Sequence, residues 1–452
     1  MNKVKSLLPK GFRDFNTEVM RKRNFIFQTV QSVFECYGYS QIQTPAIEDI
    51  TCLTGNYGDE GDRLIFKILN SGDFLKKIDF KDSINSKDLS KKISKKALRY
   101  DLTVPFARFV SQNRNDLTFP FKRYQMQNVW RADRPQRGRF REFYQCDVDI
   151  VGTDSLLCEI ELIQIYDEVF TKLGIRGVDI CINNRKLLSG ILEIMNASDS
   201  FNDVVVILDK IDSIGMEKAK DDLNSIGLNA KSISILDKFL NAENLNDIEP
   251  LINKSEIGLE GFKELKFVMS KIKKLKLSSA NLKFDVKLAR GLSYYTGCIF
   301  EVKNNNVKIG SIGGGGRYDN LTSNFGLNNM SGVGISFGLD RIFIVMEELN
   351  LFSNQNNSFT QVMFMNFGDD SLNYCLALLK KLRDKNIRSE IYPSVEKIKK
   401  QMNYANNLSV KYVVFVGEDE INSEILTVKE MSSGNQSQMN VLELIKKIQD
   451  NE

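Results

Sequence analysis

The stretch that most constrains how this chain can fold runs from residue 121 to residue 152 and predicts two strands joined by an arginine-rich loop. Side chains alternate between the two faces of a strand, so each predicted strand has one apolar face and one more polar face. The more polar faces comprise Arg123, Gln125, Gln127, Val129 and Arg131 in the first strand, and Phe143, Gln145, Asp147 and Asp149 in the second. Such a surface makes a poor hydrophobic core and favours the floor of a binding site.

The loop between these two predicted strands concentrates positive charge. Five arginines lie within eleven residues: Arg131, Arg134, Arg137, Arg139 and Arg141. Asp133 and Glu142 balance them only in part, and Pro135 and Gly138 favour a turn. Guanidinium groups match phosphate in bidentate fashion, so the loop favours an anionic ligand. The alternative is an ordinary solvated hairpin tip without a ligand.

Length and charge limit the class of protein. A chain of 452 residues exceeds what one hydrophobic core usually supports, so two or three domains are expected. The 62 basic and 58 acidic residues leave a net charge of only +4, so any contact with nucleic acid must come from local patches. No apolar run is long enough to span a membrane, and residues 1–10 lack the apolar core of a signal peptide. We expect a soluble cytoplasmic protein without membrane contact.

The chain contains no histidine, and this excludes several kinds of catalytic site. Histidine general bases, Ser-His-Asp and Cys-His nucleophile systems and most zinc catalysis are ruled out. The seven cysteines lack the spacing of a zinc site or a disulfide framework, which predicts reduced, buried thiols and no metal held by them. Catalysis is therefore expected to depend on arginines, carboxylates, backbone dipoles and Mg²⁺.

Apolar periodicity outlines the elements around the predicted hairpin. Helices are expected from about Thr17 to Tyr37 and over residues 153–175. Residues 39–50 predict a strand that Pro45 interrupts, at a sheet edge or an interface. The lysine-rich stretch 73–96 has few large apolar residues, which predicts an exposed excursion rather than core.

The second half of the chain predicts two further modules. Residues 190–280 repeat helical patterns and are expected to form a mostly helical insertion. Its lysines at 271, 273, 274 and 276 either touch nucleic acid or form a solvated helix face, and the pattern leaves both open. After a predicted linker at residues 354–358, alternating strand and helix patterns predict a small α/β domain.

A polar pair, Asp101 and Thr103, precedes the predicted hairpin. The two side chains share a face if the backbone is extended. Asp101 either caps a helix that begins near Val104 or belongs with Thr103 to a binding site. The residues alone do not separate these alternatives.

Two arginines and a glycine run mark a third candidate region. The residues with the strand parity of Arg290 are Phe284, Val286 and Leu288, so this arginine continues an apolar inward face and needs either an anionic ligand or a protein carboxylate. The four glycines at 313–316 form either a flexible linker or, as their flanks favour, a backbone pressed against a ligand or a neighbouring strand. Arg341 lies in the first turns of a predicted helix, whose N-terminus is also suited to phosphate.

These motifs together resemble the histidyl-tRNA synthetase family, a class II aminoacyl-tRNA synthetase family, over nearly the whole chain. The resemblance is carried by RYDLT at 99–103, by WRADRPQRGRFREFYQCDVDIVG at 130–152, and by ARGLSYYTG at 289–297 followed by GGGGRYDNL at 313–321. TPAIE at 44–48 resembles motif 1 of class II enzymes, which lies at a dimer interface, and GVGISFGLDRI at 332–342 resembles motif 3.

The resemblance implies an α+β fold and a domain plan. It implies a class II antiparallel sheet flanked by helices, built from residues 1–189 and 281–350. Residues 190–280 would be the helical insertion domain, 351–358 a linker and 359–452 a C-terminal α/β anticodon-binding domain. A homodimer is expected from the motif 1 match.

The resemblance also implies how L-histidine binds. Asp101 and Thr103 would hold its α-ammonium, and Gln145 its α-carboxyl end. The remaining implied contacts to the imidazole or its pocket are Asp149, Tyr294, Tyr295 and Tyr318. A buried carboxylate accepts an N–H that an isosteric side chain cannot offer, and an unpaired buried group penalises the wrong amino acid.

For ATP, the resemblance implies that Arg131 and Arg290 bracket the α-phosphate as the catalytic residues. Arg139 and Arg341 would bind the remaining phosphates, and Phe143 would stack on adenine. The histidine carboxylate is already a nucleophile at neutral pH, so no general base is required. Positioning and charge stabilisation by the two guanidinium groups and Mg²⁺ would form histidyl-adenylate, and transfer to the 3′ end of tRNA(His) would follow.

Two other functions compete with this interpretation. One is a synthetase-like regulatory or histidine-sensing paralogue that charges no tRNA; such proteins tend to lose the arginine of the ARGL motif or the C-terminal domain, and this chain keeps both. The other is a class II synthetase for a different amino acid, although Asp149 with Tyr294 and Tyr295 suits an imidazole better.

The sequence departs from the family pattern at Ser293, where an acidic residue is expected after ARGL. The absence of histidine from an enzyme that would use histidine is also unusual. It either frees synthesis of the protein from its own product or reflects drift in a Lys-, Asn- and Ile-rich proteome. An equally histidine-poor proteome in the same organism would remove the motive for the first explanation.

Overall fold

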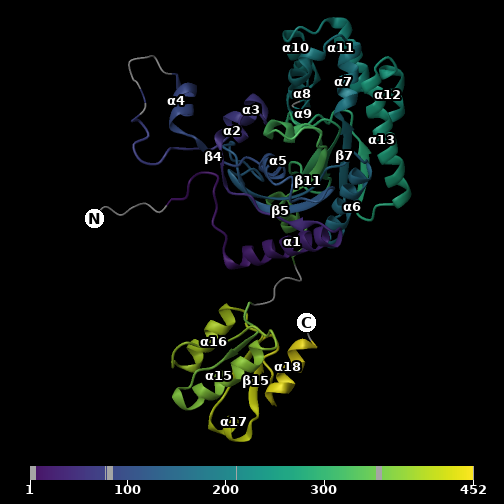
Figure 1. Ribbon diagram of the computed structural model, residues 1–452. Helices are drawn as coiled ribbons and strands as arrows, with labels where there is room; N and C mark the ends of the chain where they lie inside the picture. The colour runs from purple at the N-terminus through teal and green to yellow at the C-terminus, as the bar shows by residue number, and fades with distance from the viewer. Residues whose placement is uncertain (1–6, 77, 79–84, 210, 353–358, 451–452) are drawn as a thin grey trace. The chain divides into compact units, whose positions relative to one another are not determined.

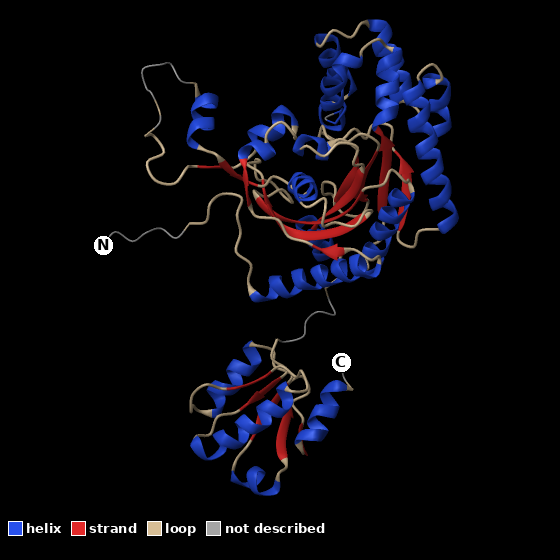
Figure 2. Ribbon diagram, in the orientation of Figure 1, coloured by secondary structure: helices blue, strands red, loops and turns tan. Residues whose placement is uncertain are grey.

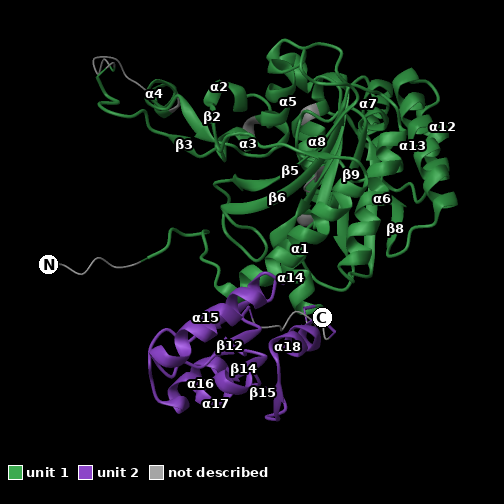
Figure 3. Ribbon diagram, turned by 60° about the horizontal axis from the view of Figure 1, so that its bottom comes forward, with its two compact units in different colours: residues 1–351 green, residues 352–452 purple. Residues whose placement is uncertain are grey.

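The structure is a computed structural model that describes residues 7–76, 78, 85–209, 211–352 and 359–450. The chain divides into two compact units, residues 1–351 and 352–452 (Figure 3). Among the described residues, no helix is both long and apolar enough to cross a membrane. The expected linker at 354–358 lies outside the described residues, and the expected domain boundaries stay a prediction.

The first unit is built on an eight-stranded sheet. In spatial order its strands are β1 (Ser40–Gln41), β5 (Phe121–Trp130), β6 (Glu142–Val151), β11 (Gly332–Gly338), β10 (Gly313–Tyr318), β9 (Cys298–Asn304), β7 (Val178–Asn184) and β8 (Ala280–Phe284). Only the two end pairs, β1 with β5 and β7 with β8, are parallel. All other neighbours are antiparallel, which confirms the predicted fold class.

Helices cover both faces of this sheet. Figures 1 and 2 show the sheet curving around α5 (Thr103–Gln112), while α1 (Thr17–Cys36) runs along its convex side. Helices α6 (Leu157–Lys172) and α14 (Leu339–Glu348) pack against α1, and Figure 3 shows α14 beside it. Helix α1 begins where the Asn16 side chain accepts a hydrogen bond from the Val19 amide. Its Phe34 packs against Tyr124 and Phe337, with ring centroids 5.5 and 5.8 Å apart. The polar faces of β5 and β6 are thus left for the concave side.

Residues 39–50 do not form the single strand that was expected. Strand β1 lies at the edge of the large sheet, whereas β2 (Ile47–Asp49) pairs with β4 (Lys96–Leu98) in a separate three-stranded sheet completed by β3 (Lys67–Ile68). Pro45 separates the two strands because it cannot donate to a strand ladder. Short helices follow: α2 (Ile50–Leu53), α3 (Gly58–Arg63) and α4 (Ser86–Ile93).

The segment between β7 and β8 is helical, as its sequence predicts. It contains α7 (Arg185–Ile194), α8 (Phe201–Asp209), α9 (Ile211–Ile214), α10 (Met216–Ser225), α11 (Ala230–Leu240), α12 (Leu245–Ile252) and α13 (Glu256–Leu275). Helices α7 and α13 approach most closely at Gly190 and Gly258, where an added Cβ would meet the facing backbone. Glycine is needed there because the two backbones touch.

The second unit is a small α/β domain. Its sheet has the order β13 (Ser389–Ile391), β12 (Val362–Phe364), β14 (Tyr412–Phe415), β15 (Leu426–Glu430) and β16 (Gln436–Met439). Its helices are α15 (Asp369–Arg383), α16 (Ile398–Asn407), α17 (Glu418–Ser423) and α18 (Val441–Gln449). The alternation of strand and helix predicted from the sequence is confirmed.

All seven cysteines are free thiols. Four are buried, whereas Cys36 is exposed and Cys52 and Cys158 are partly exposed, so the expectation that all would be buried is wrong. No group of three or more Cys, Asp or Glu side chains among the described residues is placed to hold a metal ion.

Candidate active site

Strands β5 and β6 place their polar faces on the same side, as the alternation predicts. Arg123 pairs with Asp149 across the two strands, Gln125 with Asp147, and Gln127 with Gln145. The Arg123 guanidinium is fully buried, lies 2.8 Å from an Asp149 carboxylate oxygen and rests 4.1 Å from the Phe106 ring centroid. This face is therefore an ordered polar floor.

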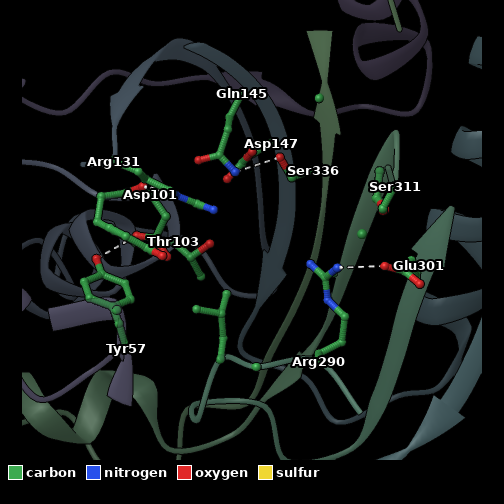
Figure 4. Close-up of a pocket in the computed structure, with 18 of the residues that line it drawn as sticks. Tyr57, Asp101, Thr103, Arg131, Gln145, Asp147, Arg290, Glu301, Ser311 and Ser336 are labelled. Carbon is green, nitrogen blue, oxygen red and sulfur yellow. Dashed lines mark hydrogen bonds and ion pairs between the residues drawn. The ribbon is translucent and has the colours of Figure 1, made fainter. Parts of the chain in front are cut away.

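A cavity of about 620 Å³ opens over this floor. All twelve predicted site residues line it: Asp101, Thr103, Arg131, Arg139, Phe143, Gln145, Asp149, Arg290, Tyr294, Tyr295, Tyr318 and Arg341. They come from the start of α5 and the residues just before it, the loop between β5 and β6, β6 itself, the loop before β9, β10 and α14. Figure 4 shows Arg131 and Arg290 reaching toward the centre from opposite walls. Side chains far apart in the sequence thus share one cavity.

Arg290 reaches the cavity in a way that strand parity did not predict. Strand β8 ends at Phe284, and Arg290 lies in the following loop with φ of 58°. A non-glycine residue in this left-handed region carries local strain, which is typical of functional positions. Its guanidinium lies 3.8 Å from a Glu301 carboxylate oxygen, a long ion pair between two partly exposed side chains. The prediction that Arg290 extends a strand is wrong, although its place in the cavity agrees with the site prediction.

The glycine run explains how Arg290 fits. These residues form β10, so the flexible-linker alternative is wrong. A Cβ on Gly314 would lie 2.7 Å from the Arg290 guanidinium, and one on Gly315 would collide with the Gly334 carbonyl. Because these glycines have no side chain, Gly314 leaves space for the Arg290 guanidinium and Gly315 leaves space for the neighbouring strand β11.

Four arginines crowd the end of the cavity nearest the arginine loop. Arg341 donates from Nε to the Gly138 carbonyl at 2.8 Å and from Nη1 to the Ser311 carbonyl at 2.6 Å. Burial lowers the pKa of Arg341, and the neighbouring charges of Arg139, Arg131 and Arg290 lower it further. This mutual repulsion would be relieved by a polyanion, so the arrangement fits a phosphate chain.

Two aromatic rings hold Arg131. Its guanidinium carbon lies 4.2 Å from the Tyr100 ring centroid and 5.2 Å from the Phe143 ring centroid, and Nε donates to the Tyr100 carbonyl at 3.1 Å. Arg139 lies 2.8 Å from Asp133, with almost half of its side chain exposed. The stacked arginine is the more rigid of the two.

The part of the cavity next to Arg131 is acidic and aromatic (Figure 4). Asp101 is 1% exposed and accepts hydrogen bonds from the Tyr57 hydroxyl at 2.9 Å, the Tyr294 hydroxyl at 3.2 Å and the Val104 amide at 3.2 Å. Asp101 thus contacts the first turn of α5 and also lines the cavity, and its role in binding stays a prediction. Burial raises its pKa, and these donors and the Arg131 charge oppose the rise.

Asp149 is bound on both carboxylate oxygens. Tyr318 donates its hydroxyl to one oxygen at 2.6 Å, and Arg123 forms the ion pair with the other. A side chain at Gly334 would collide with this carboxylate. Asp149 is thus fixed in position, and since a carboxylate has four acceptor sites it can still accept a hydrogen bond from a ligand.

Sequence reasoning assigned no role to several residues that shape the cavity. Tyr57 supports Asp101, Glu301 faces Arg290, and the Ser336 hydroxyl accepts a hydrogen bond from Gln145 Nε2 at 3.0 Å. Val206 of α8 brings the helical insertion to the cavity. Only Asp147 carried a detectable signal, since it lies on the predicted polar face.

The environment of Asp147 gives a testable pH dependence. Burial raises its pKa to about 7, Asp149 and Asp101 add to the rise, and Arg123 opposes it. The folded state therefore keeps a proton that the unfolded state loses near pH 4, so this contribution to stability is complete below pH 4 and is lost as the pH rises through 7. Relative to wild type, we expect Asp147→Asn to gain roughly 2 to 3 kcal/mol of unfolding free energy between pH 5 and pH 8.

Denaturant unfolding of both proteins at pH 5, 6, 7 and 8 measures this difference. Asp154→Asn, an exposed position just beyond β6, serves as the matched control and should show no such trend. A difference between Asp147→Asn and wild type that stays constant across this range would contradict the prediction.

The close fit of Arg290 against β10 gives a second prediction. We expect Gly314→Ala to displace the Arg290 guanidinium and to lower the rate of the reaction catalysed in the cavity by roughly 10²-fold. A displacement of a catalytic group by about 1 Å has an effect of this size. The fold should persist, since the added methyl group meets the mobile end of a side chain rather than backbone. ATP–pyrophosphate exchange measures the loss.

Gly417→Ala in the second unit is the control, because its Cβ would meet only the Glu420 carboxylate, at 3.2 Å. An unchanged exchange rate in Gly314→Ala, with the fold intact, would show that the position of Arg290 against β10 is unimportant.

The antiparallel sheet, the arginine hairpin on its concave face and the helix that carries Arg341 together define the catalytic unit of a class II aminoacyl-tRNA synthetase. The family model for histidyl-tRNA synthetase matches residues 77–342, and an anticodon-binding-domain model matches residues 361–451. The chain belongs to the histidyl-tRNA synthetase family.

Curated relatives agree along nearly the whole chain. The Histidine--tRNA ligase of Christiangramia forsetii is 53% identical over 444 residues, which cover 96% of this chain and 97% of the relative. That of Phocaeicola vulgatus is 50% identical, covering 97% and 98%. The crystal structure of histidyl-tRNA synthetase from Nostoc sp. PCC 7120 superimposes over all of both chains with a TM-score of 0.81 at 29% identity.

One further structure shares the fold alone. It is described as an ATP phosphoribosyltransferase regulatory subunit/histidyl-tRNA synthetase from Bacillus halodurans C, and it matches with a TM-score of 0.72 at 19% identity, covering 91% of this chain and 98% of that one.

Proposed function

We propose that this cavity carries out both steps of the histidine--tRNA ligase reaction. The protein activates L-histidine with ATP to histidyl-adenylate and transfers the histidyl group to the 3′ end of tRNA(His). One observation supports the proposed site above all others: Arg131 and Arg290, from separate segments of the chain, enter one cavity whose other end holds buried carboxylates.

L-Histidine occupies the acidic and aromatic end in this proposal. Its α-ammonium binds Asp101 and Thr103, and Gln145 contacts the carboxyl end. Asp149 and Tyr295 grip the imidazole nitrogens, with Tyr294 and Tyr318 beside the ring; all seven side chains line the cavity. Asp149 supports this assignment because Tyr318 and Arg123 hold it still, so a ligand meets a preorganised acceptor.

ATP occupies the basic end. Arg131 and Arg290 contact the α-phosphate from two sides, Arg139 and Arg341 contact the remaining phosphates, and Phe143 stacks on adenine. The mutual repulsion of these four arginines supports the assignment, because a triphosphate would neutralise it.

The first step needs no general base. The histidine carboxylate attacks the α-phosphorus in line, a bond to its oxygen forms, and the bond to the departing pyrophosphate breaks. Arg131 and Arg290 stabilise the charge that builds on the α-phosphate oxygens in the transition state. The hydroxyl of the terminal tRNA ribose then attacks the histidyl carbonyl carbon and releases AMP.

Mg²⁺ belongs to this proposal as a companion of ATP. Among the described residues, no group of three acidic or thiol side chains is placed to hold a metal ion. Most ligands of the Mg²⁺ ion would therefore be phosphate oxygens of ATP and water. Glu301, a cavity carboxylate whose oxygen lies 3.8 Å from the Arg290 guanidinium, is the residue that we assign to the ion. The ion would supply further charge neutralisation.

The remaining partners follow from the same assignment. Arg134, Arg137 and Arg139 are exposed on the hairpin loop, which supports placing the acceptor end of tRNA(His) over residues 134–141. Residue Ile47 of the motif 1 stretch is 47% exposed, which supports a homodimer through that stretch. The proposed location is the cytoplasm, where tRNA is charged.

ATP–pyrophosphate exchange across the twenty amino acids tests the assignment. We expect exchange with L-histidine alone, because the other side chains leave Asp149 without its imidazole donor. Exchange with a different amino acid would make the protein another class II synthetase. Absence of exchange in the folded protein would favour the regulatory alternative, which the intact Arg290 and the C-terminal unit argue against.

A further inference from the structure

The Asp147 carboxylate on the cavity floor has no role in the proposed reaction. Asp147 is 2% exposed, lies on β6 midway between Gln145 and Asp149, and lines the cavity. Figure 4 shows it beside Gln145 and Ser336 on the cavity floor. Its Oδ1 atom is buried and has no hydrogen-bond partner among the described residues. Leaving such an acceptor unpaired is costly, so a missing donor is indicated.

The position of Asp147 points to the middle of the amino acid. Residues two apart along a strand are roughly 6.5 Å apart and share a face, so Asp147 lies between the two side chains assigned to the ends of the substrate. With its carboxyl end at Gln145 and its imidazole at Asp149, histidine places Cα and its ammonium group above Asp147. No other part of the substrate in this pose carries N–H donors at that point.

A count of donors leads to the same group. An α-ammonium has three N–H donors, and the proposed function supplies two acceptors, Asp101 and Thr103. Asp101 already accepts three hydrogen bonds, from Tyr57, Tyr294 and Val104, and has little remaining capacity. The third ammonium donor therefore needs another acceptor on the cavity wall.

The charges around Asp147 also favour a cationic group. It faces Arg123 of β5, Asp149 of its own strand, Asp101 from the segment before α5, and Ser336 of β11, whose side chain hydrogen-bonds to the Asp147 carboxyl group and lowers its pKa. Arg123 is already paired with Asp149. Asp147 and Asp149 thus share one buried guanidinium while Asp101 adds further negative charge, and a bound ammonium would offset it.

We propose that Asp147 is a third binding residue for the α-ammonium of the amino acid, accepting a hydrogen bond at Oδ1. This inference rests on the proposed function and adds a specificity contact to it. Free of substrate, Asp147 has a pKa raised to about 7 by burial. A bound ammonium favours the ionised carboxylate, so amino-acid binding lowers that pKa and releases a proton from a protonated Asp147.

Two inhibitors separate this contact from the rest of the pocket. Histidinol keeps the ammonium and lacks the carboxylate, whereas 3-(imidazol-4-yl)propionate keeps the carboxylate and lacks the ammonium. Both are measured as competitors of histidine in ATP–pyrophosphate exchange, in wild type, Asp147→Asn and Asp147→Ser. We expect the inhibition constant of histidinol to rise at least tenfold in the variants, and that of the propionate to change less than twofold.

Asp154→Asn is the matched control and should leave both constants unchanged, because that side chain is exposed outside the cavity. Thermal unfolding shows whether each variant is folded. Two substitutions of Asp147 are made so that the inhibition constants can still be compared if one of the two variants does not fold. Equal weakening of both inhibitors would show that Asp147 only shapes the pocket, and no weakening of histidinol would show that it does not contact the ammonium; either result overturns the inference.

Failure of the proposed function would look different. Wild-type protein would then show no exchange with L-histidine at all, before any variant is compared. The inhibition constants of the variants are therefore compared only after the wild-type protein has shown exchange with L-histidine. The comparison then tests the role of Asp147 and not the proposed function.

Discussion

Replacing Arg290 with alanine is expected to lower ATP–pyrophosphate exchange with L-histidine by roughly 10²- to 10³-fold, while the unfolding midpoint stays within a degree or two of wild type. Removing one preorganised donor to transition-state charge costs about 3 to 4 kcal/mol in a water-excluded site. Stability should hold because the side chain is partly exposed and its contact with Glu301 is loose.

Arg290→Gly separates the guanidinium from the backbone strain. Glycine adopts a φ of 58° with little strain, whereas alanine keeps the backbone strain of the wild type. The glycine variant therefore removes both the guanidinium and the backbone strain. Equal losses in the alanine and glycine variants would assign the effect to the guanidinium. Arg176→Ala, exposed between α6 and β7, is the control. Exchange by Arg290→Ala within tenfold of wild type would contradict the proposed role.

Replacing Asp149 with alanine is expected to lower the free energy of unfolding by about 3 to 5 kcal/mol, because it leaves the Arg123 guanidinium buried without its ion-pair partner. Arg123 is completely buried and cannot turn toward water. Asp147 lies close enough to become the remaining counter-charge, which places the expected loss at the lower end of the range. Denaturant unfolding at neutral pH measures it.

Asp384→Ala provides the comparison for this second prediction. Asp384 is paired with Lys380 at 3.8 Å on the surface of the second unit, where both side chains are mostly exposed. Its removal should change stability by less than about 1 kcal/mol. If the two variants lost similar amounts, the buried pair would contribute no more than a surface pair.

The polar floor of the cavity was predictable from the residues. Alternation in residues 121–152 placed Arg123, Gln125 and Asp149 on a common face, and the cross-strand pairing of β5 and β6 has them there. Side-chain direction in a strand depends on the local backbone, so it can be read without knowing the fold. The apolar face of the same strands packs against α1 for the same reason.

The same local reasoning failed where the backbone leaves a regular element. Strand parity was extended through Arg290, but β8 stops at Phe284 and the arginine lies in a loop at positive φ. Tyr57, which supports Asp101, lies in an irregular segment before the short helix α3 and offered no pattern at all. Periodicity carries no information in such segments.

The local surfaces follow from the residues alone: a polar strand face, an arginine loop, helices with one apolar side, and motifs that resemble one family. Folding of the whole chain was needed to bring Arg131 and Arg290 into one cavity, to place Arg290 against the Gly314 backbone, and to set both Asp149 and Asp147 beside Arg123. The physical reason is that side-chain direction along an element depends on a few neighbouring dihedral angles, whereas burial, charge pairing and convergence depend on contacts between residues far apart in the chain.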